Sequence, residues 1–229
     1  FRVEKSEECP DGIRQALNDI SLTINEGEFV LLLGLNSSGK TTALNIITGV
    51  YTPSEGQVEL FGNQLSDNLI PREIKERMGI VFSKVELPEQ LTVEEIISLF
   101  QSYYSNPFGI DEAIKLFELK NWRKTLLKNQ QELSQGRNKR LLIALALSGN
   151  PDLLLFDEPT ANLDPPGRRL FWQLMRDLSS QGKTILICMP EENSAQTEQT
   201  TSTIEDLSRA RELATRIGFF GLCYAMDGS

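Results

Sequence analysis

A glycine-rich segment, GLNSSGKT at residues 34–41, dictates much of the architecture open to this chain because it matches the pattern G-x-x-x-x-G-K-[ST]. It follows the apolar run Phe29–Leu33, which predicts a strand buried on both faces, and it opens a helical pattern from about Lys40 to Thr48. Successive backbone N–H groups in such a loop form a concave anion site, and the helix N-terminus adds partial positive charge. The sequence therefore predicts a phosphate-binding loop on an α/β framework.

The residues of this loop divide the work of holding a nucleoside triphosphate. Gly39 permits close approach of the backbone to phosphate, Lys40 reaches the β- and γ-phosphates, and Thr41 offers its hydroxyl to Mg²⁺. The pattern alone does not distinguish one hydrolase family from another. We expect the nucleotide to contact the whole run Gly34, Leu35, Asn36, Ser37, Ser38, Gly39, Lys40, Thr41 and Thr42.

A second acidic segment, LLLFDEPT at residues 153–160, places two carboxylates after a hydrophobic strand. In open α/β sheets ligands bind at the carboxyl ends of the strands. Asp157 is suited to hold Mg²⁺ through water, and Glu158 is suited to polarise an attacking water as a general base. The alternative is a plain strand-ending turn at Asp-Glu-Pro.

Strands alternate with helices along the chain, which indicates a mainly parallel α/β sheet. Further strands are expected at residues 20–24, 57–61, 79–82, 153–156 and 184–188, and helices at 134–146 and 165–180. The middle, about residues 88–131, has apolar residues at helical spacing and predicts a helical insert, with ordinary core the main interpretation of its apolar stripes and partner contact the lesser one. The polar segment 191–203 predicts a solvated loop.

Composition excludes several classes of function. A net charge of −9 disfavours nucleic acid as a partner. Three distant cysteines show no metal-ligand spacing and favour a reduced, cytosolic setting. No apolar run approaches the roughly 18–20 residues of a membrane-spanning helix, so at a membrane another chain is expected to span it. The chain contains no histidine, which excludes histidine-based catalysis.

The order GLNSSGKTT, LSQGR, LLLFDEPTANLD resembles the ATP-binding subunits of ABC transporters, over roughly Asn18 to Cys188. The resemblance implies ATP and Mg²⁺ as ligands, with Thr41, Asp157 and Ser83 at the metal and Glu158 and Lys40 as catalytic residues. It also implies a homo- or heterodimer of nucleotide-binding subunits, in which one subunit completes the ATP site of the other. The residues expected to act across that interface are Ser134, Gln135, Gly136, Arg137 and Asp164, the last within a D-loop at Ala161–Asp164.

The resemblance further implies an overall architecture and a location. A P-loop NTPase core of mainly parallel sheet flanked by helices is expected, with an N-terminal antiparallel β subdomain and an inserted α-helical subdomain. The whole of residues 1–229 would form one domain, with 1–87 and 132–229 as the core and about 88–131 as the helical part that docks on integral membrane permease subunits. The chain would lie in the cytoplasm, on the cytoplasmic face of the membrane, and the region 65–91 looks most like exporter-type subunits.

Two departures from the family pattern fall at the phosphates and the metal. Ser37 stands where a further glycine is usual, and a β-carbon there costs on the order of 1 kcal/mol if the backbone needs a positive φ. Ser83 aligns with a glutamine that normally reaches Mg²⁺ and senses the membrane partner. The side chain of Ser83 is too short to reach as far as that glutamine.

Other departures affect the base, the signature and the phosphate sensor. No aromatic residue lies between Arg2 and Glu28 to stack on adenine. Gln135 and Arg137 stand for a usual glycine and glutamine. The switch histidine is replaced by Pro190, or by Ile204 if the preceding loop is an insertion, and neither side chain can hydrogen-bond a phosphate.

These departures leave two mechanisms and more than one function open. Lys40, Thr41, Asp157 and Glu158 either suffice for reduced hydrolysis, or the chain binds ATP and dimerises with poor turnover beside a competent partner. The leading function is the energy-coupling subunit of a transporter; the alternative is a regulatory or assembly module that uses ATP-dependent dimerisation as a switch without transport. A DNA-repair type fits badly because the chain has no room for long coiled coils.

Overall fold

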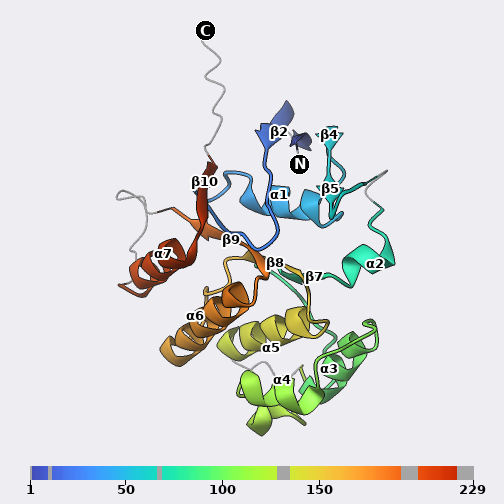
Figure 1. Ribbon diagram of the computed structural model, residues 1–229, viewed down its shortest axis with the longest axis vertical. Helices are drawn as coiled ribbons and strands as arrows, with labels where there is room; N and C mark the ends of the chain where they lie inside the picture. The colour runs from blue at the N-terminus through green and yellow to red at the C-terminus, as the bar shows by residue number, and fades with distance from the viewer. Residues whose placement is uncertain (1, 10–11, 66–68, 128–134, 192–200, 221–229) are drawn as a thin grey trace.

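The computed structural model describes residues 2–9, 12–65, 69–127, 135–191 and 201–220, and it is built on a five-stranded parallel sheet (Figure 1). The strand order is β10-β3-β9-β8-β7. All four neighbouring pairs are parallel, as the alternation of strands and helices predicts. The strands are β3 (Phe29–Gly34), β7 (Met78–Val81), β8 (Leu153–Asp157), β9 (Thr184–Pro190) and β10 (Arg216–Phe220).

The strand β3, which lies between β10 and β9, is buried on both faces because helices cover the sheet on both sides. Phe29, Leu31 and Leu33 belong to one hydrophobic cluster, together with residues of the helices α5 (Gln135–Leu147) and α6 (Pro165–Ser180). Val30 and Leu32 alternate with them and belong to a second cluster, together with α1 (Lys40–Ile47). Figure 1 shows α1 on one side of the sheet and α5 and α6 on the other. The uninterrupted apolar run in the sequence follows directly from this double burial.

A second, antiparallel sheet lies beside α1. Its order is β2-β1-β4, and a short hairpin, β5-β6, follows in the chain. This arrangement matches the expected antiparallel β subdomain. The strands are β1 (Arg2–Cys9), β2 (Gly12–Ser21), β4 (Glu55–Gln57), β5 (Glu59–Leu60) and β6 (Asn63–Gln64).

Two strand predictions in this region were partly wrong. The alternating pattern at residues 20–24 predicted a strand, but β2 ends at Ser21, and the half-buried Leu22 and Ile24 pack on the core from irregular backbone. The strand expected at 57–61 is broken after Gln57 and stops at Leu60, because Phe61 and Gly62 turn the chain with φ of 50° and 75°.

The helical insert begins with a capped helix, whose capping residue is Thr92. Thr92 accepts from the Glu95 N–H, and the Glu95 side chain accepts from the Thr92 N–H, which forms a capping box. The apolar residues of this insert join the main hydrophobic cluster, so they are ordinary core as expected. Its elements are α3 (Val93–Gln101), α4 (Ile110–Leu116) and the 3₁₀ turn η1 (Lys120–Trp122).

The remaining helices extend the expected pattern. They are α1 (Lys40–Ile47), α2 (Arg72–Lys75), α5 (Gln135–Leu147), α6 (Pro165–Ser180) and α7 (Thr201–Leu213). The loop predicted over 191–203 is wrong from Thr201 onward, where α7 begins, and residues 192–200 lie outside the described part. Among the residues that the structure describes, no helix has the length and hydropathy needed to cross a membrane.

Candidate functional site

The phosphate-loop segment joins the carboxyl end of β3 to the amino end of α1, as its sequence context predicts. Ser37 has φ of 65° and Gly39 has φ of 97°, so the chain turns through left-handed conformations twice before the helix starts at Lys40. Helix geometry leaves the first N–H groups of α1 without carbonyl partners inside the helix. The loop therefore presents backbone donors to an anion, with Asn36 and Ser37 exposed and Ser38 buried.

Gly39 is required by its packing as well as by its conformation. A β-carbon at this position would lie 2.6 Å from Leu17 Cδ2 and 2.7 Å from the Ala16 carbonyl oxygen, both on β2. The antiparallel sheet thus presses directly on the turn that precedes α1. Only glycine satisfies both this contact and the positive φ.

Lys40 is buried, with 5% of its surface exposed. Its Nζ donates to the carbonyl oxygens of Gly34 and Leu35, at 2.7 Å each, and lies 3.4 Å from Ser38 Oγ. Burial lowers the pKa of Lys40, and nearby acidic groups, Asp157 and Glu158 among them, partly oppose that change. The ammonium is therefore held against the loop by its own backbone, next to the acidic segment.

Thr41 and Asp157 meet although 116 positions separate them in the sequence. The Thr41 hydroxyl donates to Asp157 Oδ2 over 2.8 Å, and Asp157 is only 1% exposed. Its other oxygen, Oδ1, is buried without a hydrogen-bond partner among the described residues. A hydroxyl and a carboxylate oxygen suit Mg²⁺, which is typically held by one or two protein oxygens together with substrate phosphates. The pair therefore fits the ion that the sequence predicts.

Glu158 adopts an unusual backbone conformation directly after β8. Its φ is 47°, and its N–H donates to the Cys188 carbonyl on β9 over 3.0 Å. A non-glycine residue in the left-handed region costs about 1–2 kcal/mol, and such residues cluster at functional sites. The half-buried Glu158 thus lies at the carboxyl edge of the sheet, next to the Thr41–Asp157 pair.

Lys139 is a charged group near the site that the sequence analysis missed. It lies on α5, is 6% exposed, and interacts electrostatically with Asp157 and Glu158. Burial lowers its pKa, and the two acids oppose this. The sequence feature that could have revealed Lys139 was its position within an otherwise apolar face of the helix.

Two further positions flank the loop at the same edge of the sheet. Ser83 is exposed and follows the end of β7 by two residues, beside β8. Pro190 is the last residue of β9 and pairs with Gly34, and the Glu191 N–H donates to the Gly34 carbonyl over 3.1 Å. The segment after β9 therefore begins in contact with the loop, at the place where the resemblance expects a histidine.

Of the expected signature residues, Gln135, Gly136 and Arg137 lie at the start of α5, next to the expected D-loop of the same chain. A β-carbon on Gly136 would lie 2.9 Å from the Asn162 carbonyl oxygen and 3.7 Å from the Asp164 nitrogen. The Arg137 guanidinium stacks over the Trp122 ring at 4.1 Å, and Gln135 is exposed. Ser134 lies outside the described residues.

Asp164 begins the helix after that loop and is engaged within its own chain. Its Oδ1 accepts from the Gly167 N–H over 3.3 Å, which caps α6, and from Arg140 Nη2 over 2.8 Å. Burial raises the pKa of Asp164, but the bond from Arg140 lowers it, and the pKa is lowered overall. Arg140 also reaches Glu118 of the helical insert, so one arginine joins the insert to the cap of α6.

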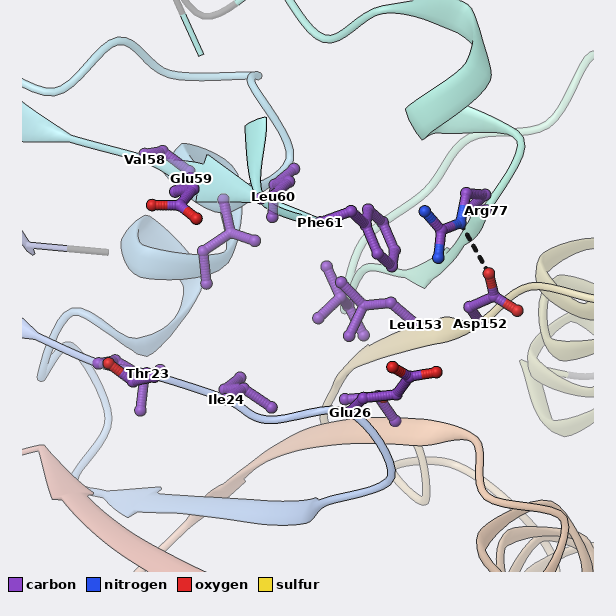
Figure 2. Close-up of a pocket in the computed structure, with 15 residues that line it drawn as sticks. Thr23, Ile24, Glu26, Val58, Glu59, Leu60, Phe61, Arg77, Asp152 and Leu153 are labelled. Carbon is purple, nitrogen blue, oxygen red and sulfur yellow. Dashed lines mark hydrogen bonds and ion pairs between the residues drawn. The ribbon is translucent and has the colours of Figure 1, made fainter. Parts of the chain in front are cut away.

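A cavity of about 360 Å³ lies elsewhere, at the opposite edge of the sheet (Figure 2). Leu153 and Thr184, the first residues of β8 and β9, line it, as does Ile24. At one side Arg77 pairs with Asp152 over 2.7 Å. Ligands of open α/β sheets bind at the carboxyl ends of strands, whereas this cavity is at the amino ends. The loop is therefore a better candidate than the cavity for the functional site.

Comparisons with known proteins agree with this geometry. The family model described as ABC transporter matches residues 17–161. The Nod factor export ATP-binding protein I of Burkholderia lata is 35% identical over 178 residues, covering 77% of this chain and 58% of that protein. The chain thus spans less than two thirds of the length of this relative.

Solved structures with the same fold include the cassette MJ0796, a bacterial ABC transporter cassette, in dimeric form. It superposes with a TM-score of 0.77 at 27% identity, covering 96% of this chain and 92% of that one. A second dimeric structure of MJ0796, in a post-hydrolysis state with ADP and Pi, has a TM-score of 0.77 at 28% identity, covering 97% and 94%. With the matched family model and the loop geometry, these likenesses show that the chain belongs to the ABC transporter family and has the fold of its nucleotide-binding domain.

Proposed function

We propose that this domain binds Mg-ATP at the phosphate loop, hydrolyses it at a reduced rate, and dimerises while ATP is bound. The observation that supports this most directly is the convergence of Lys40, Thr41 and Asp157 at the carboxyl edge of the sheet. Three groups from two separate sequence segments supply a cation, a hydroxyl and an unpaired carboxylate oxygen at one place. That set matches what a triphosphate and its magnesium ion require.

Each group has a distinct task in this proposal. The Lys40 ammonium exchanges its loop carbonyls for the β- and γ-phosphates, and the backbone N–H groups of residues 34–42 hold the phosphate oxygens. Thr41 and Asp157 hold Mg²⁺, which neutralises charge that develops on the phosphates. Glu158, one residue after Asp157, accepts a proton from the attacking water.

The dimer completes each site from the other subunit. The start of α5, with Gln135, Gly136 and Arg137, is proposed to face the γ-phosphate bound by the partner together with Ser134, which precedes it in the sequence, and Asp164 lies beside this helix start at the loop 161–164. Support comes from the packing of Gly136 on this loop, which makes the two segments neighbours in the fold, and from the dimeric structures of MJ0796.

The rate is proposed to be reduced because two polar groups are missing. Pro190 has no side-chain donor and no N–H, and the sequence contains no histidine to replace it. Ser83 is exposed and its side chain is short, so it supplies little to the metal. The core set of Lys40, Thr41, Asp157 and Glu158 remains.

The biological role that we favour is to power transport by separate integral membrane permease subunits from the cytoplasmic face. An exporter type is favoured because the relative from Burkholderia lata is named for export. The second candidate is a regulatory or assembly module that dimerises without transport, and the missing histidine favours it. Co-purification with a multi-span membrane chain, and faster turnover in its presence, would support transport over the regulatory role.

The nucleotide assignment is tested by titration and by phosphate release from the purified chain. Lys40→Ala is expected to weaken ATP binding about 100-fold, because charged hydrogen bonds contribute about 1.5–3 kcal/mol each. Glu158→Gln is expected to slow hydrolysis about 10²–10⁴-fold with ATP binding retained. Lys84→Ala, at an exposed lysine past β7, is the matched control and should change neither. Unchanged affinity in Lys40→Ala would contradict the site, and an unchanged rate in Glu158→Gln would refute Glu158 as the base.

A further inference from the structure

Asp206 on α7 is a buried acid that the proposed chemistry does not use. It is 1% exposed. Its Oδ1 accepts from the Trp172 indole N–H over 2.7 Å, and its Oδ2 accepts from Arg168 Nη1 over 3.0 Å. Both partners lie on α6, so this single carboxylate fixes α7 to α6 by two polar contacts.

Arg168 makes a further contact outside the two helices. Its Nε donates to the Leu163 carbonyl oxygen over 2.9 Å. Leu163 lies between Asn162, which has φ of 63° and whose carbonyl oxygen lies against Gly136, and Asp164, which caps α6. The guanidinium therefore bridges Asp206 and the loop 161–164.

This bridge depends on the shape of arginine. Its planar guanidinium presents donors in a fixed fork, so one side chain can bond a carboxylate and a carbonyl in defined directions. The Asp206 carboxylate, held in turn by Trp172, determines which way that fork points. A lysine has one compact ammonium and would keep the charge pair without fixing both directions.

The burial of the pair argues that it specifies geometry. Replacing buried ion pairs with apolar residues is often neutral or stabilising, so such a pair is weak evidence for stability. A role in fixing the orientation of one group, by contrast, needs the two directed bonds that are present here.

We propose that Asp206 is a positioning residue, which orients Arg168 so that its Nε holds the Leu163 carbonyl and sets the conformation of the loop 161–164. This inference rests on the proposed function, in which that loop faces the second subunit. It gives α7 a task in nucleotide-driven dimerisation, because Asp206 lies on α7 and bonds the arginine that holds the loop.

Hydrogen exchange on the full chain tests the positioning itself, in the absence of any dimer. The Ala161 N–H donates to the Glu158 carbonyl and the Leu163 N–H to the Thr160 carbonyl, each over 3.2 Å, so both amides report on loop order. Arg168→Lys, and separately Asp206→Asn, which keeps an acceptor for Trp172, should speed exchange of these amides about tenfold. Arg169→Lys, at the exposed neighbour on α6, is the matched control and should leave them unchanged.

Dimerisation is then measured by sedimentation with Mg-ATP in a Glu158→Gln background, where slow turnover keeps ATP bound. Adding Arg168→Lys should raise the dimer dissociation constant about tenfold, with nucleotide affinity at high dilution and the unfolding midpoint nearly unchanged. If the pair had only a structural role, Arg168→Lys would preserve it, and amide exchange in the loop and dimerisation would both be unchanged. That result would overturn the inference. If the Glu158→Gln parent does not dimerise, the proposed dimer fails, and the exchange rates still decide the role of Asp206.

Discussion

Ser37 places a side chain in a backbone conformation that favours glycine. Its φ is 65°, and because the residue is exposed its side chain adds little stabilising contact with its neighbours. The strain arises because a β-carbon in the left-handed region approaches its own carbonyl group. The sequence comparison with the family pattern led to this expectation, and the structure confirms the positive φ.

Ser37→Gly is therefore expected to stabilise the domain by about 0.5–1 kcal/mol, the relief of strain less the greater freedom of glycine in the unfolded chain. Urea unfolding at neutral pH measures the change. Asn36→Gly is the control, because Asn36 is also exposed but has no positive φ and should gain nothing. A loss of stability in Ser37→Gly would show that its hydroxyl matters more than its backbone.

At the same scale, residues that belong to a local motif were predictable, and pairs without such a motif were not. The phosphate loop and the Asp157–Glu158 segment can each be recognised from a few contiguous residues, and the fold class then predicts that they meet at one edge of the sheet. The Arg168–Asp206 pair joins residues 38 positions apart and has no local pattern. Lys139 is similar, because only the packing of α5 reveals that its charge lies near two acids.

Elements were predictable where their hydrophobic pattern was strong or their ends were marked. Thr92 and Glu95 mark the start of α3, and Pro165 marks the start of α6, and both helices begin there. The strand β10 and the helix α7 were both missed. The helix gave a weak signal because it is polar along most of its length, although its apolar residues Leu207 and Ala210 are fully buried. Strand order was also beyond the pattern, since it depends on packing between distant segments.

The capping box of α3 gives a prediction at this scale. Thr92→Val keeps the shape of the side chain but removes the hydroxyl that bonds both the Glu95 N–H and the Glu95 carboxylate. A loss of about 1 kcal/mol of unfolding free energy is expected, as for other caps. Ser98→Ala is the control within the same helix, because that hydroxyl donates only to the Glu94 carbonyl and its loss should be nearly neutral. Equal effects in the two variants would mean that the cap does not set the start of α3.

The molecule as a whole joins its parts through a few polar bridges. Arg140 joins the helical insert at Glu118 to the cap of α6 at Asp164, and Arg168 joins the loop 161–164 to α7. These bridges meet at the loop between β8 and α6, directly after the Thr41–Asp157 pair. A ligand bound at the phosphate loop is therefore expected to influence the stability of the whole domain.

Mg-ATP should raise the unfolding temperature in a way that depends on both the site and the dimer. At a free concentration 100 times its dissociation constant, a ligand that binds only the folded state adds about 2.7 kcal/mol, which corresponds to roughly 5–10 °C for a chain of this size. At the same concentration Lys40→Ala, with about 100-fold weaker binding, should reduce this stabilisation to about 0.4 kcal/mol. Chelating the metal should also reduce it, since Thr41 and Asp157 would lose their ion. In the Glu158→Gln chain the shift should also grow with protein concentration, because a dimer sealed by ATP is stabilised by mass action. Ser134→Arg should remove only this concentration dependence. Scanning calorimetry at two protein concentrations separates the contribution of nucleotide binding from that of dimerisation. An undiminished shift in Lys40→Ala would show that the nucleotide does not bind at the loop of residues 34–41.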